Sequence, residues 1–233
     1  MSTLSNVTPE RGKHLSPHIG LTANVSSKNS KDGVSVRCAQ KAQAAPAEKY
    51  APSPEKKWFV LRATYHREKK AYDYLINKGI ECYLPLHRTL KYIHGKRKFI
   101  TESYLPNLLF VYGTPQKVAD MMKNTPELHF LSYYYDHFSQ MAEGKNPPLT
   151  VAYDAMMSFI RVANVYNPHI KLVQPDQCHY KSGDIVRVTD GEFKGVEGRV
   201  ARVSGQQRVV VEIEGVCIIT TAYIPSAFIE KKD

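Results

Sequence analysis

Glycine-punctuated β-rich runs between residues 183 and 221 constrain the fold more than any other part of this sequence. Glycine reaches positive φ angles without a steric clash from a Cβ atom, so these glycines mark turns. The runs between them contain many β-branched residues, which favour strands. The runs cover 185–188, 199–203, 208–213 and 216–221, and the turns include Gly191, Gly195 and Gly198. Short strands joined by glycine turns predict a small closed β-barrel over 181–233.

The length, charge and apolar content of the chain restrict its class. Its 233 residues predict one or two domains, and 42% hydrophobic residues suffice for packed cores. The net charge of +10 favours a polyanionic partner, and nucleic acid is the first candidate. No run approaches the roughly 18 apolar residues that a membrane-spanning helix needs. We therefore expect a cytoplasmic protein with no membrane partner.

The cysteines give no sign of a metal site or of a disulfide framework. They are far apart and form no CxxC pair, so a zinc site has no sequence support. The length of the chain and the wide spacing of its cysteines also argue against a disulfide framework, so we expect the cysteines to be reduced thiols. The four are Cys38, Cys82, Cys178 and Cys217.

Residues 1–56 differ from the rest and predict a disordered basic tail. Ser, Ala, Lys and Pro dominate there, aromatic residues are nearly absent, and no apolar periodicity runs through the segment. It lacks the apolar core of a secretory signal. Its composition resembles a transit peptide, but only Arg11 and Arg37 supply arginine. The alternative is a flexible arm that adds non-specific affinity for nucleic acid.

Residues 57–163 alternate between strand and helix patterns. Apolar or β-rich runs predict strands, and apolar residues at helical spacing predict helices. The predicted strands cover 58–64, 80–84, 86–93, 99–104, 105–112 and 128–133, and the predicted helices cover 67–78, a segment from 115, and 150–162. This order predicts an α+β chain whose first domain is an α/β sandwich. Residues 164–180, with two prolines and little periodicity, predict a linker to the barrel.

The barrel sequence also resembles a KOW motif, and the whole order from about residue 57 is similar to the NusG family of transcription elongation factors. Three segments carry this resemblance in the order of the family: 58–61, 104–111 and 183–195. The second segment departs from the housekeeping factor, which has Gly and Tyr where this chain has Asn107 and Leu108. In that respect the chain is similar to the specialised RfaH-like paralogues, which suppress termination on long operons, including those for capsular polysaccharides. The housekeeping type remains the alternative within the family.

The resemblance implies a protein that binds RNA polymerase and performs no catalysis. An apolar concavity on the first domain is expected to hold the tip of the polymerase clamp helices. The candidates for this contact are Tyr104, Leu105, Pro106, Leu108 and Phe130. The alternative is that Leu105, Leu108 and Phe110 belong to the core, because apolar runs are usually buried. We expect a monomer.

The resemblance also implies contact with the non-template DNA strand. Lys and Arg bind phosphates or guanine edges, and Tyr stacks on unpaired bases. The candidates are Arg62, Arg67, Lys70 and Tyr74 near the first helix, and Lys96, Arg97 and Lys98 at the tip of the predicted hairpin. For the three tip residues, contact with a second element of the polymerase is an alternative to contact with DNA. The alternative is a solvated charged face. The barrel is expected to recruit the termination factor Rho or a ribosomal protein, and to remain a barrel without refolding.

Other function classes have less support in the sequence. The nine histidines include no HExxH spacing, and neither a GxSxG elbow nor a phosphate-binding loop is present. We therefore expect no enzyme activity, no cofactor and no bound metal. An RNA-binding KOW protein of ribosomal type is the main rival, and a structural scaffold is another.

Overall fold

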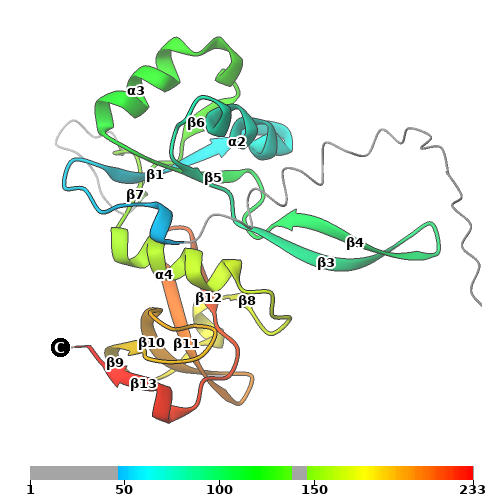
Figure 1. Ribbon diagram of the computed structural model, residues 1–233, viewed down its shortest axis with the longest axis vertical. Helices are drawn as coiled ribbons and strands as arrows, with labels where there is room; N and C mark the ends of the chain where they lie inside the picture. The colour runs from blue at the N-terminus through cyan, green and yellow to red at the C-terminus, as the bar shows by residue number, and fades with distance from the viewer. Residues whose placement is uncertain (1–46, 138–145, 233) are drawn as a thin grey trace, which may run out of the picture. The chain divides into compact units, whose positions relative to one another are not determined.

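The computed structural model describes residues 47–137 and 146–232, which form two larger sheets, a separate hairpin and three α-helices (Figure 1). Most of the tail predicted at the N-terminus, residues 1–46, lies outside the described residues. Within the described ranges, no helix is long and apolar enough to cross a membrane.

The first sheet is antiparallel, and its central strands come from two of the most apolar runs of the sequence. Its strand order is β2-β5-β1-β6, and β7 pairs with β1 on the same edge as β6. Its strands are β1 (Lys57–Ala63), β2 (Cys82–Tyr83), β5 (Leu108–Gly113), β6 (Leu131–Tyr133) and β7 (Thr150–Val151).

Strand β1 is apolar without alternation because both faces of the sheet are covered. Phe59 and Leu61 enter a cluster with the buried faces of α2 and α3. Trp58 and Val60 point to the opposite face and enter a cluster with α4. A continuous apolar run is what a strand buried on both faces requires. The helices are α2 (Glu68–Asn77), α3 (Pro115–Asn124) and α4 (Tyr153–Asn164).

The sequence correctly predicted the end of α2 and the start of α3, but not the start of α4. Gly79 follows α2 with φ 72°, as expected for a residue that ends a helix. Thr114 caps α3 by accepting a hydrogen bond from the Lys117 amide at 3.4 Å. The prediction that the third helix starts at Thr150 is wrong, because Thr150 and Val151 pair with β1 as β7.

Packing begins before the predicted boundary at residue 56. A short 3₁₀ helix, η1 (Ala47–Lys49), leads to Tyr50, which is 1% exposed. The Tyr50 ring meets Trp58 edge to face at 4.8 Å, and its hydroxyl donates to the Cys82 carbonyl at 2.8 Å. The described part of the predicted tail, 47–56, is therefore tied to the first sheet by an aromatic contact that its polar composition concealed.

The second sheet is the predicted small β-barrel, with strand order β13-β9-β10-β11-β12-β8. Its strands are β8 (Lys171–Val173), β9 (His179–Val188), β10 (Glu197–Val203), β11 (Gln206–Ile213), β12 (Cys217–Thr220) and β13 (Ile229–Lys231). The prediction of a linker over 164–180 is wrong in its second half. There, Leu172 and Val173 pair with Ile219 and Ile218 of β12, so the barrel recruits a strand that precedes its glycine-rich sequence.

The three barrel glycines singled out from the sequence have two different structural reasons. Gly191 and Gly195 have φ angles of 81° and 80°, which L-residues with side chains rarely adopt. Gly198 lies in β10, where a Cβ atom would stand 2.2 Å from the carbonyl oxygen of Val210. Gly198 therefore permits close approach of two strands and not an unusual turn.

Strands β3 (Leu86–Ile93) and β4 (Lys96–Ser103) form a two-stranded hairpin that projects from the rest of the described chain (Figure 1). Its turn places His94 and Gly95 at positive φ, as a tight hairpin turn requires. Among the described residues, no third strand joins this pair. Both broad faces of the hairpin therefore have side chains near solvent.

Candidate functional site

The loop that leads into α2 has an unusual backbone. Tyr65 and His66 adopt φ angles of 55° and 53°, and the Tyr65 side chain is 87% exposed. The His66 amide donates to Oδ1 of Asn107 at 2.9 Å, and the Ala63 amide donates to the Asn107 carbonyl at 2.7 Å. Left-handed geometry at non-glycine residues costs energy and concentrates at functional sites. The turn at Asn107 thus holds an exposed aromatic ring in front of α2.

A basic surface surrounds this loop. The Arg67 guanidinium lies 4.2 Å from the centre of the Phe130 ring and donates to Thr64 Oγ1 at 2.8 Å. Lys70 Nζ lies 5.8 Å from the same ring centre. Phe130, predicted to contact the polymerase, is 4% exposed and instead supports these two cations.

The other two candidates near α2 differ in accessibility. Arg62 is exposed on β1, between Leu108 of β5 and Ser132 of β6. Tyr74 is half-buried, and Lys78 Nζ lies 5.7 Å from its ring centre. We name the surface formed by Arg62, Tyr65, Arg67, Lys70 and Tyr74 the α2 surface.

The three cations predicted at the hairpin tip belong to a separate surface. Lys96, Arg97 and Lys98 are all exposed on β4. The hairpin connects to α2 at its other end, where Lys69 Nζ donates to the Thr101 carbonyl at 2.8 Å. The seven candidates for DNA binding therefore form two groups and not a single patch.

The five residues predicted to hold the polymerase also do not form one exposed face. Leu105 is 7% exposed and belongs to the cluster that contains α4, and Phe130 is buried in the cluster that contains α2. Pro106 is exposed, and Tyr104 and Leu108 are half-buried. Accessible candidates for the polymerase contact are therefore restricted to Tyr104, Pro106 and Leu108.

A cavity of about 480 Å³ lies where the base of the hairpin meets the end of α4. Tyr104 is the one polymerase candidate in its lining, and its ring stacks on His87 at 4.3 Å. Burial lowers the pKa of His87, so the neutral imidazole is favoured beside the apolar wall. Apolar and aromatic side chains dominate the lining, namely Leu86, Leu90, Phe99, Tyr104, Val165, Tyr166 and Ile170.

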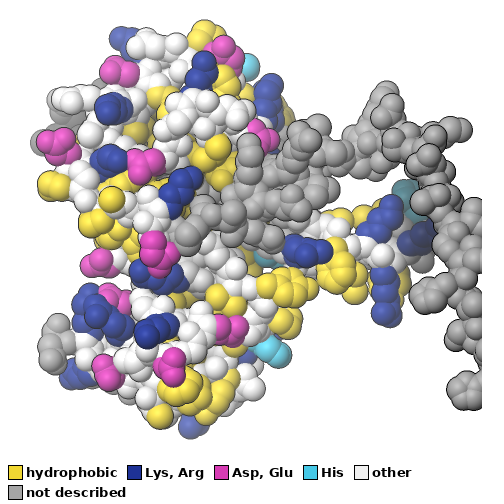
Figure 2. Space-filling view, in the orientation of Figure 1, with side chains coloured by type: hydrophobic (Ala, Val, Ile, Leu, Met, Phe, Trp, Pro, Cys, Tyr) yellow, Lys and Arg dark blue, Asp and Glu magenta, His cyan; other side chains and the backbone are white. Residues whose placement is uncertain are grey.

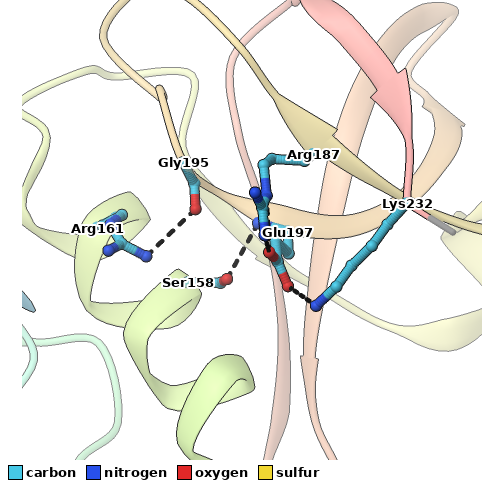
Figure 3. Close-up of polar contacts among 6 residues, drawn as sticks. All are labelled: Ser158, Arg161, Arg187, Gly195, Glu197 and Lys232. Carbon is cyan, nitrogen blue, oxygen red and sulfur yellow. Dashed lines mark hydrogen bonds and ion pairs between the residues drawn. The ribbon is translucent and has the colours of Figure 1, made fainter. Parts of the chain in front are cut away.

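Helix α4 also packs against β10, β11 and β12 of the barrel (Figure 3). The Arg161 guanidinium donates to the Gly195 carbonyl at 3.2 Å, and the Glu197 amide donates to Ser158 Oγ at 3.0 Å. Ser158 is buried, and its Oγ accepts this hydrogen bond from the backbone of β10. The start of β10 is thereby fixed to one face of the helix.

Glu197 joins this contact to two cations of the barrel. Its carboxylate accepts from Arg187 Nη2 at 2.6 Å and from Lys232 Nζ at 2.5 Å (Figure 3). Burial alone raises the pKa of this carboxyl, but the hydrogen bonds from Lys232 and Arg187 outweigh it, and the pKa is lowered. The ionised form of Glu197 is therefore the one that stabilises the fold.

This ion pair predicts a stability change with acid. Because the pKa of Glu197 is lower in the folded state, its contribution is complete above the unfolded value of about 4.3 and is lost as the pH falls through the folded value. Glu197→Gln should cost about 1–2 kcal/mol at pH 7, since hydrogen bonds to charged groups are lost and both cations are partly exposed. Urea unfolding at pH 7 and pH 3 measures this, and the variant should lose less stability on acidification than the parent. The exposed Glu127→Gln in the first domain is the control, and an equal pH response in both variants would contradict the assignment.

Two family models match this chain in the order of its two sheets. The model described as transcription termination factor NusG matches residues 56–142, which include all of β1 to β6. The model described as the KOW motif matches residues 182–212 in the barrel. Together these matches support assignment of the chain to the NusG family.

Curated relatives match a smaller part of the chain. The large ribosomal subunit protein uL24 of Fusobacterium nucleatum is 41% identical over 59 residues, which are 25% of this chain and 50% of that protein. The uL24 protein of Flavobacterium johnsoniae is 47% identical over 47 residues, 20% of this chain and 44% of that protein. The chain thus spans about half the length of these relatives, and the resemblance to them is partial.

The matched families consist of transcription factors or ribosomal proteins without enzyme activity, which is consistent with the expectation that the chain is not an enzyme. In the described ranges, no group of three or more His, Cys, Asp or Glu side chains could hold a metal ion. Cys82, Cys178 and Cys217 are free thiols, and burial raises the pKa of Cys82 and Cys217 to about 12.

The structure explains one departure from the housekeeping NusG pattern and adds one residue to the site. Asn107 has φ 66°, a region that Asn and Gly reach more readily than other residues, so both fit the same turn. Tyr65 was missed by sequence reasoning because no pattern predicts a tyrosine in left-handed geometry. The sequence Tyr65-His66-Arg67, which lies between a predicted strand and a predicted basic helix, was the signal that could have identified Tyr65.

Proposed function

We propose that this chain is a specialised transcription elongation factor that binds RNA polymerase and promotes read-through of long operons, such as those for surface polysaccharides. The observation that carries the proposal is the succession of a NusG-type domain and a KOW barrel, matched by separate family models. The specialised type is supported by Asn107 and Leu108, which stand where the housekeeping factor has Gly and Tyr. We expect it to act as a cytoplasmic monomer.

The polymerase contact in this proposal lies at Tyr104, Pro106 and Leu108, facing the tip of the clamp helices. Exposure of Pro106 and partial exposure of the other two support this choice. An apolar anchor surrounded by polar residues is typical of protein interfaces. Leu105 and Phe130 would then act indirectly, by supporting the turn and the α2 surface.

A transcription assay with purified bacterial RNA polymerase tests the proposal. On a template with a terminator, the chain should increase the fraction of transcripts that extend past the terminator. Binding to polymerase with increased termination would favour the housekeeping alternative, in which the barrel contacts Rho. Read-through unchanged by any amount of the chain would contradict the proposal.

The α2 surface is proposed to contact the displaced non-template DNA strand. Its cations supply phosphate contacts, and Tyr65 and Tyr74 supply rings for base stacking. Lys70→Gln should weaken binding of single-stranded DNA and reduce the salt slope of log K by about 0.7, since one phosphate contact is lost. Fluorescence anisotropy over a salt series measures both quantities.

The matched control for this prediction is Lys123→Gln, which makes the same charge change at an exposed position of α3. It should leave the salt slope unchanged, because α3 lies outside the α2 surface. Equal effects of the two variants would mean that net charge, and not this surface, determines DNA affinity.

The second candidate function is an RNA-binding KOW protein of ribosomal type, which the partial uL24 matches favour. It predicts salt-sensitive binding to ribosomal RNA in the absence of polymerase. We also propose that the KOW barrel docks a ribosomal protein when the chain acts as a transcription factor, so ribosome association alone does not separate the two functions. Association with free ribosomal RNA in the absence of polymerase does separate them.

A further inference from the structure

One face of the β3–β4 hairpin carries aromatic rings and arginines in alternation. In an antiparallel pair, directly opposed residues share a face, and every second residue of a strand returns to it. The register opposes Leu90 to Phe99 and Tyr92 to Arg97. The face thus consists of Arg88, Leu90 and Tyr92 on β3 and Arg97, Phe99 and Thr101 on β4, and we name it the hairpin face.

The rings on the hairpin face are exposed and are paired with guanidinium groups. Tyr92 is 67% exposed and Phe99 is 56% exposed. The Arg97 guanidinium lies 5.3 Å from the Tyr92 ring centre, and Arg88 lies 5.0 Å from that of Phe99. Figure 2 shows hydrophobic side chains beside Lys and Arg side chains on the projecting hairpin. Rings that are more than half exposed stabilise little by burial, which indicates a binding role.

The net charge of the hairpin indicates what kind of partner it binds. Residues 86–103 carry five cationic side chains and one carboxylate, Glu102, which gives a formal charge of +4. Glu102 is itself paired with Lys91 at 2.6 Å. The five cations are Arg88, Lys91, Lys96, Arg97 and Lys98. A polyanion with flat apolar groups complements this surface, because cations meet phosphates while rings and guanidinium planes stack on bases.

We infer that the hairpin face binds unpaired DNA bases, with Tyr92 and Phe99 as stacking rings and Arg88 and Arg97 as flanking cations. Arg88 and Tyr92 are four residues apart, so the face is about 14 Å long, enough for two rings to stack separate bases. DNA is chosen over RNA because the Lys69–Thr101 hydrogen bond joins the hairpin to helix α2, which carries Lys70 and Tyr74 of the α2 surface. The choice of DNA rests on the proposed function, whereas the stacking chemistry rests on the hairpin alone.

The test measures binding of the full chain to labelled oligothymidylate by fluorescence anisotropy. Tyr92→Ala and Phe99→Ala should each weaken binding about tenfold, the usual effect of removing one stacking ring. Their salt slopes should match the parent, because no charge is removed. Tyr223→Ala removes a ring of similar exposure from the barrel and should change nothing. Circular dichroism confirms that each variant folds.

Two further binding measurements, with a DNA duplex and with oligouridylate, identify the class of ligand. A DNA duplex of the same length should bind equally well to the parent and to Tyr92→Ala, because paired bases cannot stack on the ring. Tighter binding of oligouridylate than of oligothymidylate would overturn the choice of DNA. Unchanged oligothymidylate affinity in both ring variants would overturn the inference altogether.

Polymerase binding by the same variants separates this inference from the proposed function. If Tyr92→Ala binds polymerase like the parent but loses oligothymidylate affinity, both ideas hold. If the parent itself fails to bind polymerase, the proposed function fails, whatever the oligonucleotide result. Tyr92 is the preferred variant because it lies outside the cavity that Tyr104 lines.

Discussion

Leu105→Asp is expected to unfold the chain or to lower its free energy of unfolding by about 3–5 kcal/mol. Leu105 is 7% exposed and packs in the cluster shared by the first sheet and α4. An uncompensated charge at such a position costs about this much. Ser103 Oγ already bonds to both the amide and the carbonyl of Leu105, so it is poorly placed to solvate a new carboxylate.

Urea unfolding followed by circular dichroism measures this effect, and Pro106→Asp is the matched control. The neighbouring Pro106 is exposed, so the same introduced charge should change stability by less than about 1 kcal/mol. Retention of the fold by Leu105→Asp with loss of polymerase binding would contradict the burial of Leu105. It would return this residue to the polymerase interface, as the sequence resemblance implied.

Gly198→Ala is expected to destabilise the barrel by about 3 kcal/mol. Its Cβ atom would lie 2.2 Å from the carbonyl oxygen of Val210 and 3.0 Å from Cγ1 of Val209. A backbone oxygen cannot move aside without disturbing the ladder between β10 and β11, in which Arg199 opposes Val210. Overpacking of this kind typically costs about 1–3 kcal/mol, and a backbone clash places this site at the upper end.

The control for this prediction is Gly205→Ala in the β10–β11 turn. Gly205 has φ 77° and no atom within 4 Å of an added Cβ, so only the left-handed backbone is penalised, by about 1 kcal/mol. Denaturant midpoints of the two variants should therefore differ clearly. Equal midpoints would show that β10 and β11 are not in close contact at Gly198.

Strong local patterns predicted most of the fold. The apolar run of β1, the hairpin around Gly95 and the barrel glycines each have a local physical cause, so single-sequence reasoning found them. Strand β8 was not predicted from the sequence, because it has only three residues and pairs with β12, which lies far along the chain. The burial of Tyr50 was not predicted either, because a single aromatic residue in a polar segment forms no periodic pattern.

The candidate site was harder to predict than the fold. Leu105 and Leu108 lie in one apolar run, and the turn between them determines which side chain is buried. Sequence alternation cannot be extended through a turn of this kind. Phe130 was predicted to contact the polymerase, but its ring is buried next to Arg67 and Lys70. Stacking partners such as Tyr92 and Arg97 became apparent only from the strand register.

The most direct test of the proposed function is binding of the full chain to purified bacterial core RNA polymerase, measured beside binding to free ribosomal RNA. We expect a stable complex with polymerase that Pro106→Asp weakens without loss of fold. The contradicting result is salt-sensitive binding to ribosomal RNA with no polymerase complex, which would assign the chain to the ribosomal type of KOW protein.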